Sequence, residues 1–357
     1  MADRGTSLSG DCLKLTSYFG ERHRTGRDFT GNALLDLYAN REIAASVLLR
    51  GTQGFGLRQH LRTDRSLTLS EDLPVVAVAV DTRARIESVL DQTLEMAPGL
   101  VTLEHARLLD DDSLFGLPVS SQEEETKLTV YLGSRDQAYQ IPAYEAICDL
   151  LYRRCIAGAT ALLGVDGTRR GRRQRARLFS REVEVPMMVI AVAPWDQTMG
   201  VIPGVSRLLR HPLLTLELVR VCKRDGLFLG VPDRSPGTGG HGMALCQKLT
   251  VYTSAGALHE GQPIHRTLAR RLRSAGLSGV TTLRGLWGYR GEHAPHGDSA
   301  LHLGHHVPAI TIVIDTPERI PAAFAIIDEL TAERGLVTSE TIPAIRTTAG
   351  GGRKGQP

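Results

Sequence analysis

One short motif occurs three times along the chain at wide and similar intervals. Each copy opens with Lys-Leu-Thr and places a tyrosine four residues after the lysine. The copies occupy residues 14–18, 127–131 and 248–252. The lysines are 113 and then 121 residues apart, which is too long for a solenoid unit and typical of a small domain.

A pair of glycines recurs at a fixed distance from each motif. The first glycine lies 37 residues after the motif lysine, and the second lies three residues further on. These glycines are Gly51 and Gly54, Gly164 and Gly167, and Gly285 and Gly288. Because the spacing holds over three copies, we expect the 357-residue chain to contain three tandem copies of one domain.

The composition shifts along the chain predict where these copies begin and end. The repeats are predicted at 11–109, 125–222 and 246–346, the linkers at 110–124 and 223–245, and a disordered Gly-rich tail at 347–357. Both inter-repeat stretches contain a Leu-Phe pair, at Leu114 and Phe115 and at Leu227 and Phe228. Each pair is expected to dock on the protein before the chain continues as a flexible linker.

Each repeat is predicted to have the order β-α-β-β-α-β. Prolines open the first helix of repeats two and three, at Pro142 and Pro263. The third strand is apolar throughout and starts after Pro74, Pro186 or Pro308. This order is typical of an α+β, ferredoxin-like domain that leaves one sheet face open. Three copies in one chain can cover those faces mutually, so we predict an intramolecular pseudo-trimer with the motif tyrosines packed where the sheets meet.

Single residues predict three local details. Asp81 and Asp315, each followed by a threonine, are expected to cap the second helix of repeats one and three. Two glycines and a proline within 200–204 weaken the second helix of repeat two. The first helix of that repeat is expected to end near Ala157 and the following glycine.

The bulk composition excludes several classes of protein. No apolar run approaches the ~18 residues needed to cross a bilayer, so membrane insertion is not expected. The chain start lacks an apolar signal region and the five cysteines form no Cys-x-x-Cys pair, which favours reduced thiols and a cytoplasmic location. A formal net charge of +3 is too small to imply a polyanionic partner. Of 42 basic residues only 5 are lysine, so arginine richness in one loop is weak support for a site.

Several motifs together resemble a known family. They are the first strand Lys-Leu-Thr-Val-Tyr, the helix at 143–147, the segment 156–160, the glycine-rich loop 51–56 and the run 69–76. With these motifs the chain resembles the PII-like proteins grouped as domain of unknown function 190. The resemblance implies ferredoxin-like subunits assembled as trimers, nucleotide binding in the clefts between subunits, and a role in signalling. Repeat two departs from the pattern, since it has Thr168 and Arg169 where repeat one has Phe55 and Gly56.

The loop after the second strand is the main candidate for a binding site in each repeat. Its glycines permit close backbone approach to a ligand and can form an anion-binding nest, although a tight turn after a strand also needs glycine. By resemblance, the loop corresponds to the T-loop of PII proteins. The candidate ligand-binding residues are Gly51, Gly54, Phe55, Gly56 and Arg58, then Gly164, Gly167, Arg169 and Arg170, and finally Gly285, Gly288, Tyr289 and Arg290.

Two versions of this loop carry distinctive side chains. Repeat two has six arginines within 169–177, which suit phosphates or acidic surfaces, or a solvated charged loop. No aromatic residues interleave them, which argues against nucleic acid. Repeat three has five of the twelve histidines within 293–306. His302, His305 and His306 are candidate ligands for Zn²⁺ or Cu²⁺, with a plain polar loop as the alternative.

These features favour a non-catalytic regulatory protein. The leading hypothesis is a PII-like sensor that binds a small anionic ligand, such as a nucleotide, between repeats and contacts a regulated protein through three unlike loops. The second is a metal-binding or metal-tolerance protein of the CutA-like type that uses the histidine-rich loop. The third is an enzyme with an active site between repeats, which no recurring nucleophile elbow or Walker loop supports.

Overall fold

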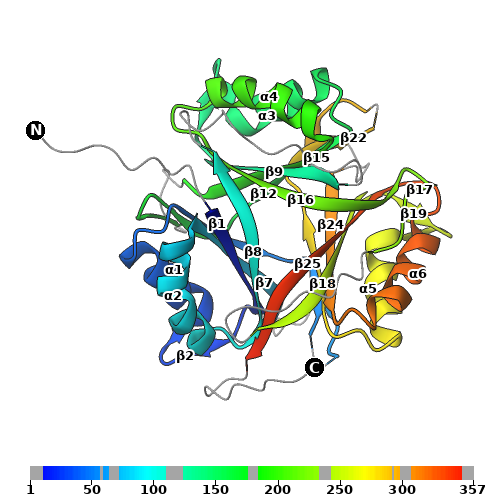
Figure 1. The fold of residues 1–357 in the computed structure, drawn as a ribbon, viewed down its shortest axis with the longest axis horizontal. Coiled ribbons are helices and arrows are strands. Elements are labelled where there is room, and N and C mark those ends of the chain that lie inside the picture. Colours follow the sequence, from blue (N-terminus) through cyan, green and yellow to red (C-terminus); the bar gives the residue numbers. More distant parts are fainter. Residues whose placement is uncertain are drawn as a thin grey trace, which may run out of the picture.

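The computed structural model describes residues 11–56, 59–63, 72–109, 124–175, 184–232, 243–291, 293–297 and 307–347. The protein is α+β, and three repeated units of strands and helices form one curled antiparallel sheet (Figure 1). The strands surround the centre of the molecule, and a pair of helices from each repeat lies on the outside (Figure 1).

Each repeat contributes four long strands and two helices in the same order. Repeat one has β1 (Asp11–Gly20), α1 (Thr30–Asn40), β4 (Ala45–Arg50), β7 (Pro74–Thr82), α2 (Arg83–Met96) and β8 (Gly99–Leu109). Repeat two has β9 (Glu124–Gly133), α3 (Ala143–Arg153), β12 (Gly158–Leu163), β15 (Pro186–Ala193), α4 (Trp195–Leu208) and β16 (Leu213–Arg224). Repeat three has β18 (Ala244–Ser254), α5 (Ile264–Ser274), β21 (Val280–Arg284), β24 (Pro308–Asp315), α6 (Ile320–Leu330) and β25 (Leu336–Thr347).

Short strands complete each unit. Those that follow the second long strand are β5 (Gln53–Phe55), β6 (Arg62–Thr63), β13 (Asp166–Arg169), β14 (Arg172–Arg175), β22 (Trp287–Arg290) and β23 (His296–Gly297). Two-residue hairpins precede the first helices, and they are β2 (Arg24–Thr25) with β3 (Asp28–Phe29), β10 (Gln137–Ala138) with β11 (Ile141–Pro142), and β19 (Leu258–His259) with β20 (Gln262–Pro263). One more strand, β17 (Leu227–Phe228), pairs with the end of β16. None of the helices in the described ranges is long and apolar enough to span a membrane.

The long strands have the same antiparallel order in every repeat. In repeat one β4 pairs with β7, β7 with β1, and β1 with β8. The corresponding strands pair in the same way in repeat two and in repeat three. The motif strand is therefore central in each sheet, and its neighbours fix its register on both sides.

The repeats are joined through both edges of these sheets. On one edge a short strand of each repeat adds to the preceding repeat in cyclic order: β5 pairs with β21, β13 with β4, and β22 with β12. On the other edge the last strands pair with one another, β8 with β16, β16 with β25, and β25 with β8. Both sets of pairings run cyclically through the three repeats, so the units close on one another.

Successive side chains along each strand point to opposite faces of the sheet, so one set packs under the helices and the other packs at the centre of the molecule. Leu13 and Leu15 of β1 face the helices of their own repeat, and repeats two and three have equivalent helix-facing clusters. A further cluster at the centre contains residues from all three repeats. Tyr131 and Tyr252 belong to it and Tyr18 packs against it, as predicted for the motif tyrosines.

The predicted aspartate caps are not formed. The Asp81 carboxylate accepts the backbone N–H of Ala44 (2.8 Å), just before β4, and the Asp315 carboxylate accepts that of Ser278 (2.7 Å), just before β21. Neither α2 nor α6 has a side-chain cap, and α6 begins only at Ile320. These aspartates therefore tether one strand to the next, which a local capping pattern cannot reveal.

Repeat two differs from prediction at both of its helices. Helix α3 ends at Arg153 rather than near Ala157, because Cys155 takes the left-handed conformation (φ 59°). Helix α4 is complete across 200–204. An added Cβ at Gly204 would lie 2.9 Å from Leu150 Cδ2 of α3, so this glycine permits close helix packing.

The predicted docking of the second Leu-Phe pair is largely wrong. Leu227 is 65% exposed and Phe228 is 53% exposed, because both belong to the hairpin strand β17 at the end of β16. The Phe228 ring lies beside the Phe324 ring of α6, with 6.2 Å between the two centroids. The first pair, Leu114 and Phe115, lies outside the described residues, as does the tail beyond Thr347.

The chain is expected to be a monomer of 38.8 kDa in solution. Among the described residues, the outer long strands of each repeat already pair with another repeat, which removes the main route to edge-to-edge association. Light scattering should therefore report one chain per particle. A stable trimer of chains would show that the repeats pair between chains instead.

Candidate functional site

The paired glycines lie where the repeats join. A Cβ on the second glycine of each pair would come within 2.4 Å of a neighbouring carbonyl oxygen: Gly54 near Val280, Gly167 near Ser46 and Gly288 near Ala159. The first glycines, Gly51, Gly164 and Gly285, donate to the carbonyls of Pro74, Pro186 and Pro308 at 2.7–2.8 Å. The second glycine of each pair is thus required by strand addition between repeats, which is a conformational reason for glycine that needs no ligand.

A cavity of about 260 Å³ lies between repeats one and three. Gly54, Phe55 and Gly56 line one side of it. Apolar and aromatic side chains form much of the wall, namely Tyr18, Phe19, Leu100, Val280, Ile312 and Ile314. The structure therefore brings three of the predicted ligand-binding residues to a largely apolar cavity at a repeat junction.

Four basic residues surround this cavity. His23, His60 and Arg62 come from repeat one, and Arg346 comes from the end of β25. No aspartate or glutamate is among the described residues that line it. Arg62 pairs with Asp72 at 2.8 Å, and the Arg346 guanidinium lies 3.9 Å from the Asp315 carboxylate. The arrangement combines an apolar wall with positive charge and suits a small anion that has an apolar part.

The equivalent junction between repeats two and three is almost filled. Its cavity measures about 20 Å³. The Tyr289 hydroxyl donates to the Ile156 carbonyl (2.9 Å) and its ring packs edge-on against Tyr152. The Arg290 guanidinium donates to Asp225 (3.0 Å), and burial lowers its pKa although Asp225 opposes this. Both predicted residues therefore close this junction.

At the junction between repeats two and one, polar contacts form within repeat two and across to repeat one. The Arg169 guanidinium donates to Asp136 (2.6 Å) and to the His211 carbonyl (3.3 Å). Hydroxyl groups of Ser46 and Thr168 hydrogen-bond across the junction at 2.7 Å. Arg170, the next residue, is exposed and donates its backbone N–H to Ala44.

The remaining loop predictions are only partly described. Arg173 of the arginine-rich loop pairs with Asp166 at 2.7 Å and with Asp36 of α1, so this arginine binds its own chain. Arg58 lies outside the described residues. The proposed metal ligands, His302, His305 and His306, lie outside them too.

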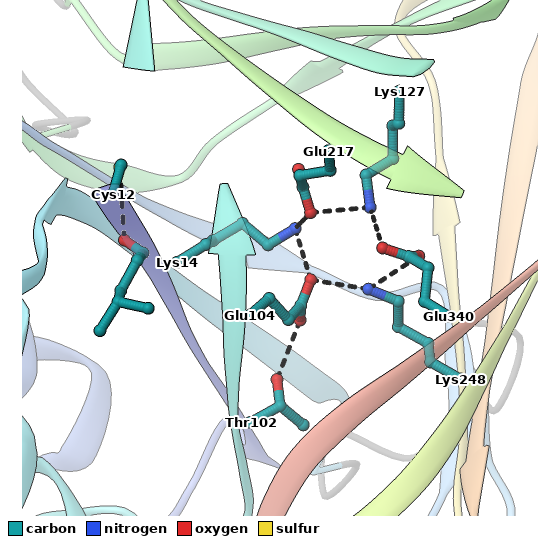
Figure 2. A network of polar contacts seen from close by, with 9 residues as sticks. Cys12, Lys14, Thr102, Glu104, Lys127, Glu217, Lys248 and Glu340 are labelled. Carbon is teal, nitrogen blue, oxygen red and sulfur yellow. Dashed lines mark hydrogen bonds and ion pairs between the residues drawn. The ribbon is translucent and has the colours of Figure 1, made fainter. Parts of the chain in front are cut away.

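A closed ring of six charged side chains lies at the centre of the molecule (Figure 2). Each motif lysine contacts the glutamate opposite it in its own repeat and a glutamate of another repeat. The contacts are Lys14 with Glu104 (2.6 Å) and Glu217, Lys127 with Glu217 (2.9 Å) and Glu340 (2.7 Å), and Lys248 with Glu340 (3.0 Å) and Glu104 (2.7 Å). The side chains are at most 10% exposed, and the ring as a whole is electrically neutral.

The ring keeps its members charged despite burial. Burial alone would raise the pKa of Glu104, but Lys14, Lys248 and Lys127 hold that pKa well below 4.5. The pKa of Glu340 is also lowered, since Lys127 and Lys248 outweigh burial. Burial alone would lower the pKa of Lys14, and the glutamates instead raise it well above 10.5.

The three glutamates are close enough together to hold a metal ion. One carboxylate oxygen from each lies within 4.8 Å of the others. The lysine ammonium groups, however, already supply the positive charge between these carboxylates. The donor set is therefore that of an ion-pair network, and we assign the ring a structural role.

Sequence reasoning missed the ring although a signal was present. Only 5 of the 42 basic residues are lysines, and three of these open the motif copies. Glutamates follow them after 90, 90 and 92 residues, at positions 104, 217 and 340. A charged residue inside an apolar strand, at nearly the same spacing from one of opposite charge in every repeat, predicts a buried pair.

Comparison with known proteins gives a family match over most of the chain. The family model described as DUF190, Uncharacterized ACR, matches residues 12–108, 125–221 and 246–344. Among solved structures, an anthrone oxidase-like protein aligns with 60% of this chain and 94% of its own, at 11% identity and a TM-score of 0.16. CrmK, a flavoenzyme involved in the shunt product recycling mechanism in caerulomycin biosynthesis, aligns with 83% of this chain and 57% of its own, at 15% identity and the same TM-score. Similarities this low carry no argument about fold or function.

Neutralising one ring glutamate should destabilise the protein strongly. Glu217→Gln leaves Lys14 and Lys127 buried with one fewer counter-charge each, and breaking a buried pair in this way costs about 3–5 kcal/mol. Urea denaturation should measure this loss of unfolding free energy. The control is Glu329→Gln, which removes an exposed pair with Arg271 and should leave the unfolding free energy nearly unchanged. Equal losses in the two variants would contradict a central role for the ring.

The stabilising effect of the ring should depend on pH in a defined direction. The folded-state pKa values of Glu104 and Glu340 are lowered, so their contribution is present above the unfolded value of about 4.3 and is lost as pH falls through the folded values. The difference in unfolding free energy between wild type and Glu104→Gln should be constant from about pH 6 to 9 and shrink below about pH 4. A difference that stays unchanged at pH 3 would contradict this reasoning.

Proposed function

Because the chain belongs to the DUF190 family and carries three tandem copies of its domain, we propose that it is a PII-like regulatory protein that binds a small anionic ligand between repeats. We further propose that each repeat is a ferredoxin-like unit and that the three form an intramolecular pseudo-trimer. The strand order shared by the repeats and the cyclic pairing at their junctions support this view.

The observation that carries the proposal is the basic cavity between repeats one and three. Arg62 and Arg346 come from different repeats and both line it, so an anion there would contact both. Tyr18, Phe55 and Ile312 offer apolar contacts to the rest of the ligand. A nucleotide combines a flat base with phosphates and fits this chemistry.

One hydroxyl group of the wall is engaged in a structural contact. Ser278 is a hydroxyl-bearing residue of the wall, and its hydroxyl donates to Asp315 at 2.9 Å. Its carboxylate partner also accepts two backbone N–H groups, which identifies it as a structural tether. The site is therefore proposed to sense a ligand without transforming it.

The proposed output is contact with a regulated protein. Residues 54–56 line the cavity and lead directly into the loop that differs most among the repeats. A ligand that fills the cavity would contact this segment and bias its arrangement. Fusion of three repeats in one chain leaves each loop free to differ, which identical subunits do not allow.

A thermal-shift screen tests the proposed function. A ligand at about 100 times its Kd should stabilise the chain by about 2.7 kcal/mol, which raises the melting temperature. The panel contains AMP, ADP, ATP and inorganic phosphate, the last as a test of charge alone. Arg346→Gln should weaken binding of the best compound about 10- to 100-fold, because it removes a charge-assisted hydrogen bond of about 1.5–3 kcal/mol.

The control for that variant is Arg271→Gln, which removes an exposed arginine of α5 outside the cavity. It should leave the affinity unchanged. If no compound in the panel raises the melting temperature at millimolar concentration, the proposed function is wrong.

A further inference from the structure

One position in each repeat controls the space at the junction. Gly54, Gly167 and Gly288 occupy equivalent places, since each contacts a carbonyl of the neighbouring repeat. The residues two positions further along are therefore equivalent as well. They are Gly56 in repeat one, Arg169 in repeat two and Arg290 in repeat three.

Gly56 leaves its junction open. It lines the 260 Å³ cavity, and a Cβ added there would meet no atom of the described residues within 4 Å. Its φ is not among the positive values found in the described residues, so the backbone at this point does not require glycine. Because Gly56 has no side chain, the space beside it in the cavity stays empty.

Arg169 fills the corresponding place in the junction of repeats two and one. Its first partner, Asp136, is equivalent to His23 of repeat one. The backbone N–H of Asp136 donates to the Gly133 carbonyl, and that of His23 donates to the Gly20 carbonyl at the same place in repeat one. The second partner of Arg169 is the backbone carbonyl of His211, which precedes Glu217 by six residues. Pro98 precedes Glu104 by six residues in repeat one, so the two positions are equivalent. His23 and Pro98 both line the open cavity, so the Arg169 side chain occupies the equivalent space.

Arg290 fills the junction of repeats three and two. Its guanidinium pairs with Asp225 of repeat two, and the remaining cavity has about 20 Å³. In both closed junctions a carboxylate neutralises the arginine. Arg62 and Arg346 of the open junction also lie near carboxylates, so the junctions differ in the space that their side chains fill.

We propose that this chain binds one ligand molecule, at the junction of repeats one and three, and that glycine or arginine at the position of Gly56 decides whether a junction is a site or a closed joint. This inference rests on the proposed function, since it assumes that the cavity binds an anion. The ligand class is a small anion with an apolar body, because the wall is apolar and aromatic while Arg62 and Arg346 are cationic. The other two junctions then hold the repeats together without binding ligand.

The test counts molecules of 8-anilinonaphthalene-1-sulfonate, a fluorescent anion with an aromatic body, by titration calorimetry and fluorescence. The wild-type chain should bind one molecule. The double variant His23→Asp with Gly56→Arg copies the Arg169–Asp136 pair into the open junction, and its neutral pair fills space without adding an unpaired cation. Its affinity for the probe should fall at least 10-fold.

A matched control adds arginine away from the junctions. Gly200 of α4 is exposed and has open space around its Cβ position, so Gly200→Arg should fold and bind the probe as wild type does. Thermal unfolding of the double variant checks that it is folded. Two or three equal sites in the wild type, or unchanged binding by a folded double variant, would overturn the inference. A wild type that binds neither the probe nor any nucleotide would reject the proposed function itself.

Discussion

The neutral ring of three lysines and three glutamates is the interaction on which the assembly depends. A buried ion costs several kcal/mol unless it is paired, and each lysine here has one partner in its own repeat and one in another. Within a single repeat each lysine has only one of its two glutamate contacts, and the second comes from another repeat. The three units therefore come together in a single cyclic arrangement, with the apolar residues of the inner cluster packed around it.

The backbone pairing between repeats is cyclic in the same way as the ring. Each repeat donates a short strand to one neighbour and pairs its last strand with the others. The backbone thus follows an approximate threefold rule, while side chains break it. The junction that contains Gly56 has a cavity of about 260 Å³, whereas the junction that contains Arg290 has one of about 20 Å³.

The features predicted from sequence were those encoded by periodicity and local spacing. The repeats, the buried strands after Pro74, Pro186 and Pro308, and the central tyrosines all follow from such patterns. The ring and the cavity join side chains from distant strands, so only the topology brings them together. Local rules also failed where a side chain had a distant partner, as with Asp81, whose carboxylate serves a backbone N–H 37 residues away. The arginines that close two junctions looked like ligand-binding residues because their acidic partners were invisible in the sequence.

The cyclic closure also sets an order of events during synthesis. Lys14 and Glu217 are 203 residues apart, and Lys127 and Glu340 are 213 apart, so the ring contacts between repeats wait for much of the chain. Until Glu340 has left the ribosome, Lys127 and Lys248 each lack one of their two counter-charges and β8 lacks part of its pairing. Contacts of such long range slow folding and leave strand edges unpaired in the meantime. The price of a stable fused assembly is a nascent chain that remains exposed to aggregation until its last strand is made.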